Sequence, residues 1–135
     1  MKKVLVFGSF DLMHPGHINF LKSAKKHGDH LTVVLARDST IKKVKGKKPR
    51  FNEKERLKHI KDIGLVEKVL LGSKKDKLSV IKKLKPDIIC LGYDQKFLVK
   101  ELKEFIEKKK LSIKIKRLKA YKPHIYKSSK LKKFI

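Results

Sequence analysis

The sequence is poor in cysteine, proline and acidic residues, and each shortage excludes a class of protein. A single cysteine, Cys90, excludes a disulfide framework, and no group of cysteines and histidines has zinc-ligand spacing. Only four prolines and 40% hydrophobic residues are typical of a globular chain rather than a disordered one. We therefore expect one ordinary domain spanning residues 1–135, long enough to bury a core.

Long hydrophobic runs are also missing. No apolar stretch reaches the roughly 20 residues that a membrane span needs. Lys2 and Lys3 are followed by only four apolar residues before Gly8, too few for the core of a signal peptide. These features predict a cytoplasmic protein that has no membrane partner.

Acidic residues are few, so the charge is strongly one-sided. The chain has 38 basic and 13 acidic residues, a formal net charge of +25. Such a field attracts nucleotides, acidic cofactors or nucleic acid. Most lysines stand between apolar positions, however, as on a solvated helix face, and a lysine-rich, thermophile-like composition accounts for most of the excess. The basic residues are spread out and no nucleic-acid motif is present, so nucleic acid is not the partner we favour.

Arginine is scarce within this basic set. The sequence has only four arginines, at positions 37, 50, 56 and 117, against 34 lysines. Because only the planar guanidinium binds phosphate in a bidentate manner, each arginine is a candidate for a specific role.

Strand-like apolar runs alternate with helical patterns, which is typical of βαβ units and a parallel sheet. We expect a Rossmann-like, doubly wound α/β domain with five parallel strands. The expected strands are Lys3–Gly8, Leu31–Ala36, Val66–Leu71, Asp87–Leu91 and Ser112–Leu118. The expected helices are Pro15–His27, Glu53–Ile63, Lys77–Leu84, Leu98–Lys109 and one beginning near Ser128. Asn52 and Glu55 predict a capping box at the start of the second helix.

The most informative stretch follows the first apolar run and reads G-S-F-D-L-M-H-P-G-H, from Gly8 to His17. Pro15 suits a first helical turn, and Gly16 allows a ligand to approach the backbone. His14 and His17 are three residues apart and can face the same way beside the free N–H groups of a helix N-terminus. This arrangement predicts an anion site, and phosphate is the ligand it suits best.

This stretch resembles the signature of the cytidylyltransferase-like branch of the nucleotidyltransferase superfamily. In that family the H-x-G-H histidines hold the nucleotide phosphates while one phosphate attacks the α-phosphorus and pyrophosphate leaves. The resemblance implies that His14 and His17 are catalytic. It also implies nucleotide contacts from Ser9, Phe10, Pro15 and Gly16. Asp11 has open alternatives: it could orient the loop, bind a metal or form an Asx-type turn.

Further segments fit the same family. The lysine-rich stretch from Ala36 to Arg50 follows the second expected strand, and we read it as a mobile loop that orders on triphosphate binding. The resemblance assigns Lys43 and Lys45 to the phosphates, with Lys42 and Lys47 as possible alternatives. Arg56 matches an arginine of the family; the alternative is a surface salt bridge.

Two more segments complete the expected site. Asp94, in Leu91-Gly92-Tyr93-Asp94-Gln95, follows the fourth expected strand and could bind a ribose or stabilise its loop. Toward the C-terminus, Tyr121, Ser128 and Ser129 resemble the family's last nucleotide-binding motif. For Ser128 simple helix N-capping is compatible with that role, and for Tyr121 ordinary packing is an alternative.

The G-Y-D-Q form of the Asp94 segment, together with the segment containing Asp38, is similar to archaeal-type FAD synthetases. That resemblance implies an ATP:FMN adenylyltransferase that makes FAD and pyrophosphate, with a divalent cation such as Mg²⁺ and possible homodimers. A cytidylyltransferase acting on glycerol 3-phosphate or a similar phospho-alcohol is the alternative. Cytidylyltransferases have an arginine before the third strand where this chain has Gly64-Leu65-Val66, which disfavours CTP.

Overall fold

A five-stranded parallel sheet forms the centre of the computed structural model, which describes residues 1–11, 15–72, 78–92 and 96–118. The strand order is β3-β2-β1-β4-β5, and every neighbouring pair is parallel. The strands are β1 (Lys3–Gly8), β2 (His30–Leu35), β3 (Lys68–Leu71), β4 (Ile88–Leu91) and β5 (Lys114–Arg117). The α/β class and the five parallel strands predicted from the sequence are confirmed.

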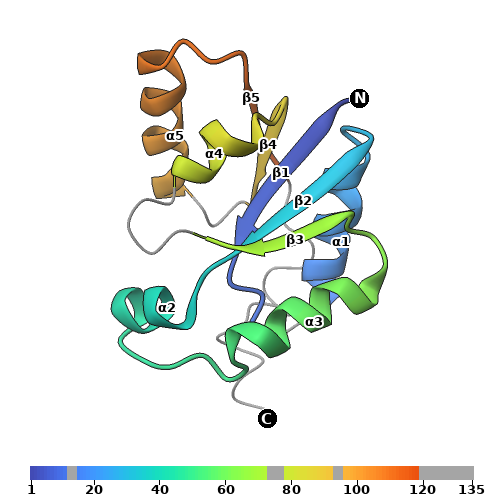
Figure 1. Ribbon diagram of the computed structural model, residues 1–135, viewed down its shortest axis with the longest axis vertical. Coiled ribbons are helices and arrows are strands. Elements are labelled where there is room, and N and C mark those ends of the chain that lie inside the picture. Colours follow the sequence, from blue (N-terminus) through green and yellow to red (C-terminus); the bar gives the residue numbers. More distant parts are fainter. Residues whose placement is uncertain (12–14, 73–77, 93–95, 119–135) are drawn as a thin grey trace.

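In the described residues, five helices connect the strands: α1 (Pro15–Lys25), α2 (Asp38–Lys45), α3 (Glu53–Ile63), α4 (Ser79–Leu84) and α5 (Lys96–Lys108). In Figure 1, α1 and α3 cover one face of the sheet, and α4 and α5 cover the other. The expected helix near Ser128 lies outside the described residues. Among the described residues, no helix is long and apolar enough to span a membrane.

Alternation along the strands divides the core into two layers. Val4 and Val6 of β1 pack in one cluster with Leu21 of α1 and Ile60 of α3. Leu5, one position away, belongs to the other cluster, which includes residues of α4 and α5. Successive side chains of a strand point to opposite faces, so a strand covered on both faces must be apolar at almost every position. The continuous apolar runs in the sequence have this cause.

Helix ends follow local sequence signals. The Asn52 side chain accepts a hydrogen bond from the Glu55 N–H (2.8 Å), and the Glu55 carboxylate accepts one from the Asn52 N–H (3.4 Å). The predicted capping box is therefore confirmed. Gly64 ends α3 in the left-handed conformation (φ 78°), which favours glycine.

The topology reverses direction at β1. The chain moves from β1 to β2 and β3 on one side, then crosses to β4 and β5 on the other. In sheets of this kind ligands bind beyond the carboxyl ends of the strands, where the order reverses. Here that point lies between β1 and β4, which pair from Val4↔Ile88 to Val6↔Cys90.

Cys90 lies at this central position with no exposed surface, as the sequence predicted for a core residue. Burial raises the pKa of its thiol to about 11, although the charge of Lys116 acts in the opposite direction. The thiol is therefore protonated at neutral pH, and the thiolate is the form that reacts.

We expect the native protein to resist Ellman's reagent at pH 8. Release of about one equivalent of thionitrobenzoate should follow only after addition of guanidinium chloride, because this is the chain's single cysteine. Labelling of the folded protein within seconds would contradict a buried, protonated Cys90.

Candidate active site

The turn after β1 depends on a close contact between Gly8 and Phe10. A Cβ atom placed on Gly8 would lie 2.5 Å from the Phe10 Cε2 atom, closer than such atoms approach. Phe10 has a positive φ of 46°, which is unusual for a bulky residue and turns the chain sharply away from the strand. A side chain at position 8 would therefore require the Phe10 ring to move.

The ring of Phe10 points into the core rather than toward solvent. Only 4% of the residue is exposed, and its ring contacts Phe20 (6.4 Å between centroids) and His17 (5.3 Å, nearly perpendicular). The sequence analysis named Phe10 as a nucleotide-binding residue. Its ring is directed elsewhere, so any nucleotide contact from Phe10 would come from its backbone, while the ring supports the side of His17.

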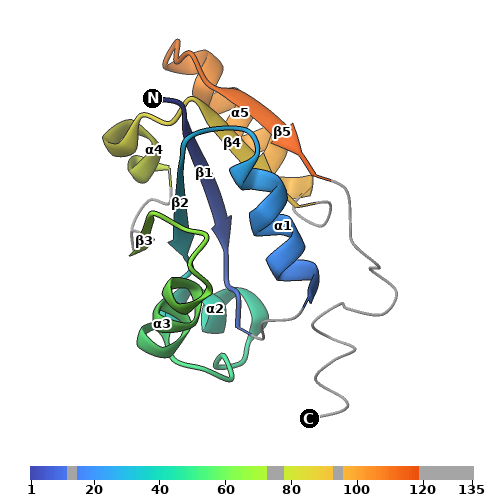
Figure 2. The ribbon, with the colours of Figure 1, turned by 90° about the vertical axis from the view of Figure 1, so that its right-hand side faces the viewer.

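Helix α1 begins at Pro15, as predicted, and places Gly16 and His17 in its first turn. The N–H groups of a first helical turn lack partners within the helix, and they carry the positive end of the helix dipole. The start of α1 therefore has the properties of a phosphate site at the carboxyl end of β1. Figure 2 shows α1 running back along the sheet from this end.

Asp11 joins this turn to a segment that is distant in the sequence. Its carboxylate accepts hydrogen bonds from the backbone N–H groups of Arg50 and Phe51, both at 2.8 Å. The side chain is buried (6% exposed), and charge-assisted bonds of this kind are strong. Of the alternatives left open by the sequence, orientation of a loop is the one these bonds support.

Arg56 forms a salt bridge to an aspartate, Asp38, as the alternative expected, but its side chain is fully buried rather than at the surface. Its guanidinium donates to three acceptors: the Phe51 carbonyl (3.1 Å), the Ser9 carbonyl (2.9 Å) and Asp38 Oδ1 (2.8 Å). These acceptors belong to the segment before α3, the turn after β1, and the start of α2. One side chain therefore fixes three segments around the carboxyl end of β1.

A second set of bonds continues from Asp38 toward β3. Glu53 accepts a hydrogen bond from the Asp38 N–H (3.0 Å), and Arg37 lies 3.6 Å from the other Glu53 carboxylate oxygen. The Arg37 Nε–H donates to the Gly72 carbonyl, just beyond β3 (2.6 Å). The ends of β1, β2 and β3 are thus joined by one polar network.

The sequence analysis did not identify Glu53 as part of this network. Its only local signal is a carboxylate in the first turn of a predicted helix, a common feature that gives no indication of a distant partner. The scarcity of arginine, in contrast, did single out Arg37 and Arg56 before the structure was known.

The expected loop from Ala36 to Arg50 contains a helix, so the sequence analysis was wrong on this point. Ile41 is buried (5% exposed) and anchors one side of α2. Asp38 occupies the first turn, lysines the last, and Gly46 ends the helix in the left-handed conformation (φ 73°). Each of these features stabilises a helix. They were not recognised in the sequence because the many lysines of this segment are equally typical of an exposed loop.

The helix also changes how the lysines can act. Lys43 and Lys45 are both exposed, but residues two apart on a helix point in different directions. Lys42 and Lys45 are three apart and lie on the same side. While α2 is intact, Lys42 and Lys45 are better placed than Lys43 and Lys45 to approach one phosphate group together.

Five predicted site residues lie outside the described residues: His14, Asp94, Tyr121, Ser128 and Ser129. Gly92 follows β4, as Ser9 follows β1, and these two strands are adjacent and parallel. Gly92 and Ser9 therefore lie at the same edge of the sheet.

The family resemblance implies a divalent cation. The described residues contain no group of three or more His, Cys, Asp or Glu side chains that could hold a metal ion. Asp11 and Asp38 already accept bonds from Arg50, Phe51 and Arg56. A protein cage for Mg²⁺ therefore does not fit this part of the chain, whereas binding through substrate phosphates is the usual manner for Mg²⁺.

Residues 5–134 match the model of the cytidylyltransferase-like family. The chain belongs to this family. Relatives named FAD synthase include one from Thermoplasma volcanium, 44% identical over 100% of this chain and 94% of the relative. Another, from Aciduliprofundum boonei, is 45% identical over 90% of this chain and 80% of its own. The family resemblance predicted from Gly8 to His17 is confirmed.

Solved structures agree with the fold. A crystal structure from Thermoplasma volcanium, described as a lipopolysaccharide core biosynthesis protein, has a TM-score of 0.83 and 45% identity, covering 90% of this chain and 98% of that one. A pantoate–β-alanine ligase from Francisella tularensis has a TM-score of 0.68 with 16% identity, covering 90% of this chain and 60% of the ligase. The second likeness concerns the fold alone.

The role of Arg56 can be tested by its removal. We expect Arg56→Ala to lower the free energy of unfolding by about 3 kcal/mol, because three partly buried acceptors lose the donor that a fully buried side chain supplies. Urea unfolding followed by circular dichroism measures the change. Arg50→Ala is the matched control, since the Arg50 side chain is exposed and its bond to Asp11 comes from the backbone. Equal unfolding midpoints for the two variants would refute the network.

Proposed function

We propose that this protein is an FMN adenylyltransferase, which transfers AMP from ATP to the phosphate of FMN and releases FAD and pyrophosphate. The observation that supports it most is similarity at 41–45% identity, over 87–100% of the chain, to several relatives named FAD synthase. The phosphate-binding character of the turn between β1 and α1 is consistent with this chemistry.

In the proposed reaction, an oxygen of the FMN phosphate attacks the α-phosphorus of ATP in line with the departing pyrophosphate. A new P–O bond forms as the bond between the α-phosphorus and its bridging oxygen breaks. FMN's phosphate is already an anion near neutral pH, so no general base is required. The protein's task is to position two anions and to stabilise the charge that develops between them.

The start of α1 is suited to that task. The N–H groups in its first turn and the His17 ring would donate to phosphate oxygens, with His14 as the second donor of the motif. Phe10 supports His17 from the core side, so the imidazole is held in place before substrate arrives. Ser9 would donate its hydroxyl to a phosphate oxygen, while the Ser9 carbonyl accepts a hydrogen bond from Arg56.

Helix α2 would bind the triphosphate from the side of β2. Lys45 would supply positive charge for the β- and γ-phosphates. Its partner would be Lys42, on the same side of α2, or Lys43, on a different side of α2. Mg²⁺ enters as part of the MgATP substrate. The nucleotide site in this proposal is completed by Asp94, Tyr121, Ser128 and Ser129. Asp11 and Asp38 would act indirectly: Asp11 holds the segment before α3, and Asp38 holds the start of α2 against Arg56.

The activity itself is directly testable. Purified protein with ATP, FMN and Mg²⁺ should yield a product that elutes as FAD, with an equivalent amount of pyrophosphate. Parallel reactions with CTP and with glycerol 3-phosphate test the cytidylyltransferase alternative; we expect little turnover, because Gly64 and Leu65 stand where cytidylyltransferases have arginine. Faster turnover of CTP with glycerol 3-phosphate would replace the proposal with that alternative.

His17 provides a test of the site. We expect His17→Ala to reduce turnover by ~10²–10³, the usual loss when one donor to a developing oxyanion is removed. Steady-state rates of FAD formation at saturating substrates measure this. His27→Ala, near the other end of α1, is the control and should leave the rate within about twofold. Unchanged turnover in His17→Ala would remove His17 from the catalytic site.

A further inference from the structure

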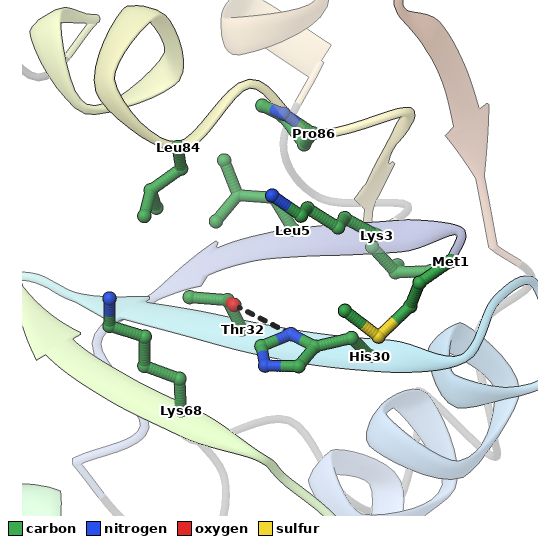
Figure 3. A pocket seen from close by; sticks show the side chains of 9 residues that line it. Met1, Lys3, Leu5, His30, Thr32, Lys68, Leu84 and Pro86 are labelled. Carbon is green, nitrogen blue, oxygen red and sulfur yellow. Dashed lines mark hydrogen bonds between the residues drawn. The ribbon is translucent and has the colours of Figure 1, made fainter.

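A pocket lies on the sheet face toward α4, near the amino ends of the strands and therefore away from the candidate active site. Its volume is about 240 Å³. Figure 3 shows side chains of β1, β2 and β3 on one side of it, with Leu84 and Pro86 across from them. The short α4 ends at Leu84 and leaves this part of the sheet face uncovered.

Strand register brings the polar residues of the pocket together. Lys3 pairs with His30, and Thr32 pairs with Lys68 on the next strand. Alternate residues of a strand share a face, so His30 and Thr32 point the same way, as do Lys3 and Leu5. Three basic side chains from three strands thereby surround one hollow.

This set of side chains has no acidic counterpart. The pocket lining contains Lys3, His30 and Lys68 but no aspartate or glutamate. In the described part of the chain, none of these three forms an ion pair. Nearby carboxylates have other partners: Asp87 accepts from the Lys3 N–H (2.8 Å), and Glu67 accepts from the Leu31 N–H (2.7 Å). A bound anion would supply the negative charge that these lysine side chains lack.

Thr32 adds a polar group at the floor of the pocket. It is 6% exposed, on a strand whose remaining residues from Leu31 to Leu35 are apolar and buried. Its hydroxyl lies 3.4 Å from His30 Nδ1, a long contact that leaves the hydroxyl capable of a better bond to a ligand. The walls formed by Leu5, Leu84 and Pro86 are apolar and suit a carbon skeleton.

We propose that this pocket binds a small organic anion, with its phosphate or carboxylate near Lys3, His30 and Lys68 and its apolar part against Leu84 and Pro86. The pocket volume of about 240 Å³ is on the scale of a small ligand such as phenyl phosphate. The site is independent of the proposed catalytic function.

The test uses ¹⁵N-labelled full-length protein and three probes of similar shape: phenyl phosphate, benzoate and neutral benzyl alcohol, at constant ionic strength. Amide signals of Leu5, Thr32 and Lys68 should shift in a saturable manner with one or both anions. The stronger of the two identifies phosphate or carboxylate as the preferred group. Benzyl alcohol should cause no comparable shift, and equal shifts with it would overturn the proposal.

Variants separate this pocket from the active site, which also attracts phosphate. Lys68→Ala and Lys3→Ala should each weaken the anion's binding roughly five- to tenfold. Lys114→Ala is the matched control, because Lys114 carries the same charge on the exposed edge strand β5, outside the pocket lining. Shifts confined to Ser9, Gly16 and His17, or equal affinities in all three variants, would refute the second site.

Discussion

The guanidinium of Arg56 is the interaction on which the arrangement of the active end depends. A buried cation is costly unless all of its hydrogen bonds are made, and here its partners come from three separate segments. The turn after β1, the start of α2 and the approach to α3 can therefore satisfy Arg56 only in one mutual arrangement. Asp11 reinforces the same geometry by binding the backbone just ahead of α3.

The consequence for chemistry is preorganisation. A site that stabilises charge on phosphate needs its donors in position before the reaction, since donors that must reorganise lose much of their effect. Residues 8–11 are held by the close approach of Gly8 and Phe10 and by the polar contacts of Asp11 and of Arg56 with Ser9, and the Phe10 ring contacts His17 in the first turn of α1. Both the buried ring of Phe10 and the guanidinium of Arg56, through its bond to the Ser9 carbonyl, stabilise the turn after β1.

Local signals explain which predictions succeeded. The strands were readable because a sheet covered on both faces requires continuous apolar runs, and the capping box because Asn52 and Glu55 satisfy each other within one turn. Helix α2 was missed because only Ile41 marks its buried side, among lysines that also suit a loop. The hydrogen bonds from the N–H groups of residues 50 and 51 to Asp11 could not be predicted from local sequence, because donor and acceptor are about 40 positions apart.

The sequence by itself determined the α/β class, the turn-and-helix unit from Gly8 to His17 and the family, because each is carried by residues close together in the chain. Only the tertiary structure decided the roles of Arg56 and Phe10, the pairing of lysines on α2 and the existence of a basic pocket at the amino ends of the strands. The Arg56 contacts and the pocket depend on tertiary packing, strand order and register, which bring distant residues together and which no short stretch of sequence encodes. The lysine pairing depends on the helical conformation of α2, which its lysine-rich sequence did not reveal.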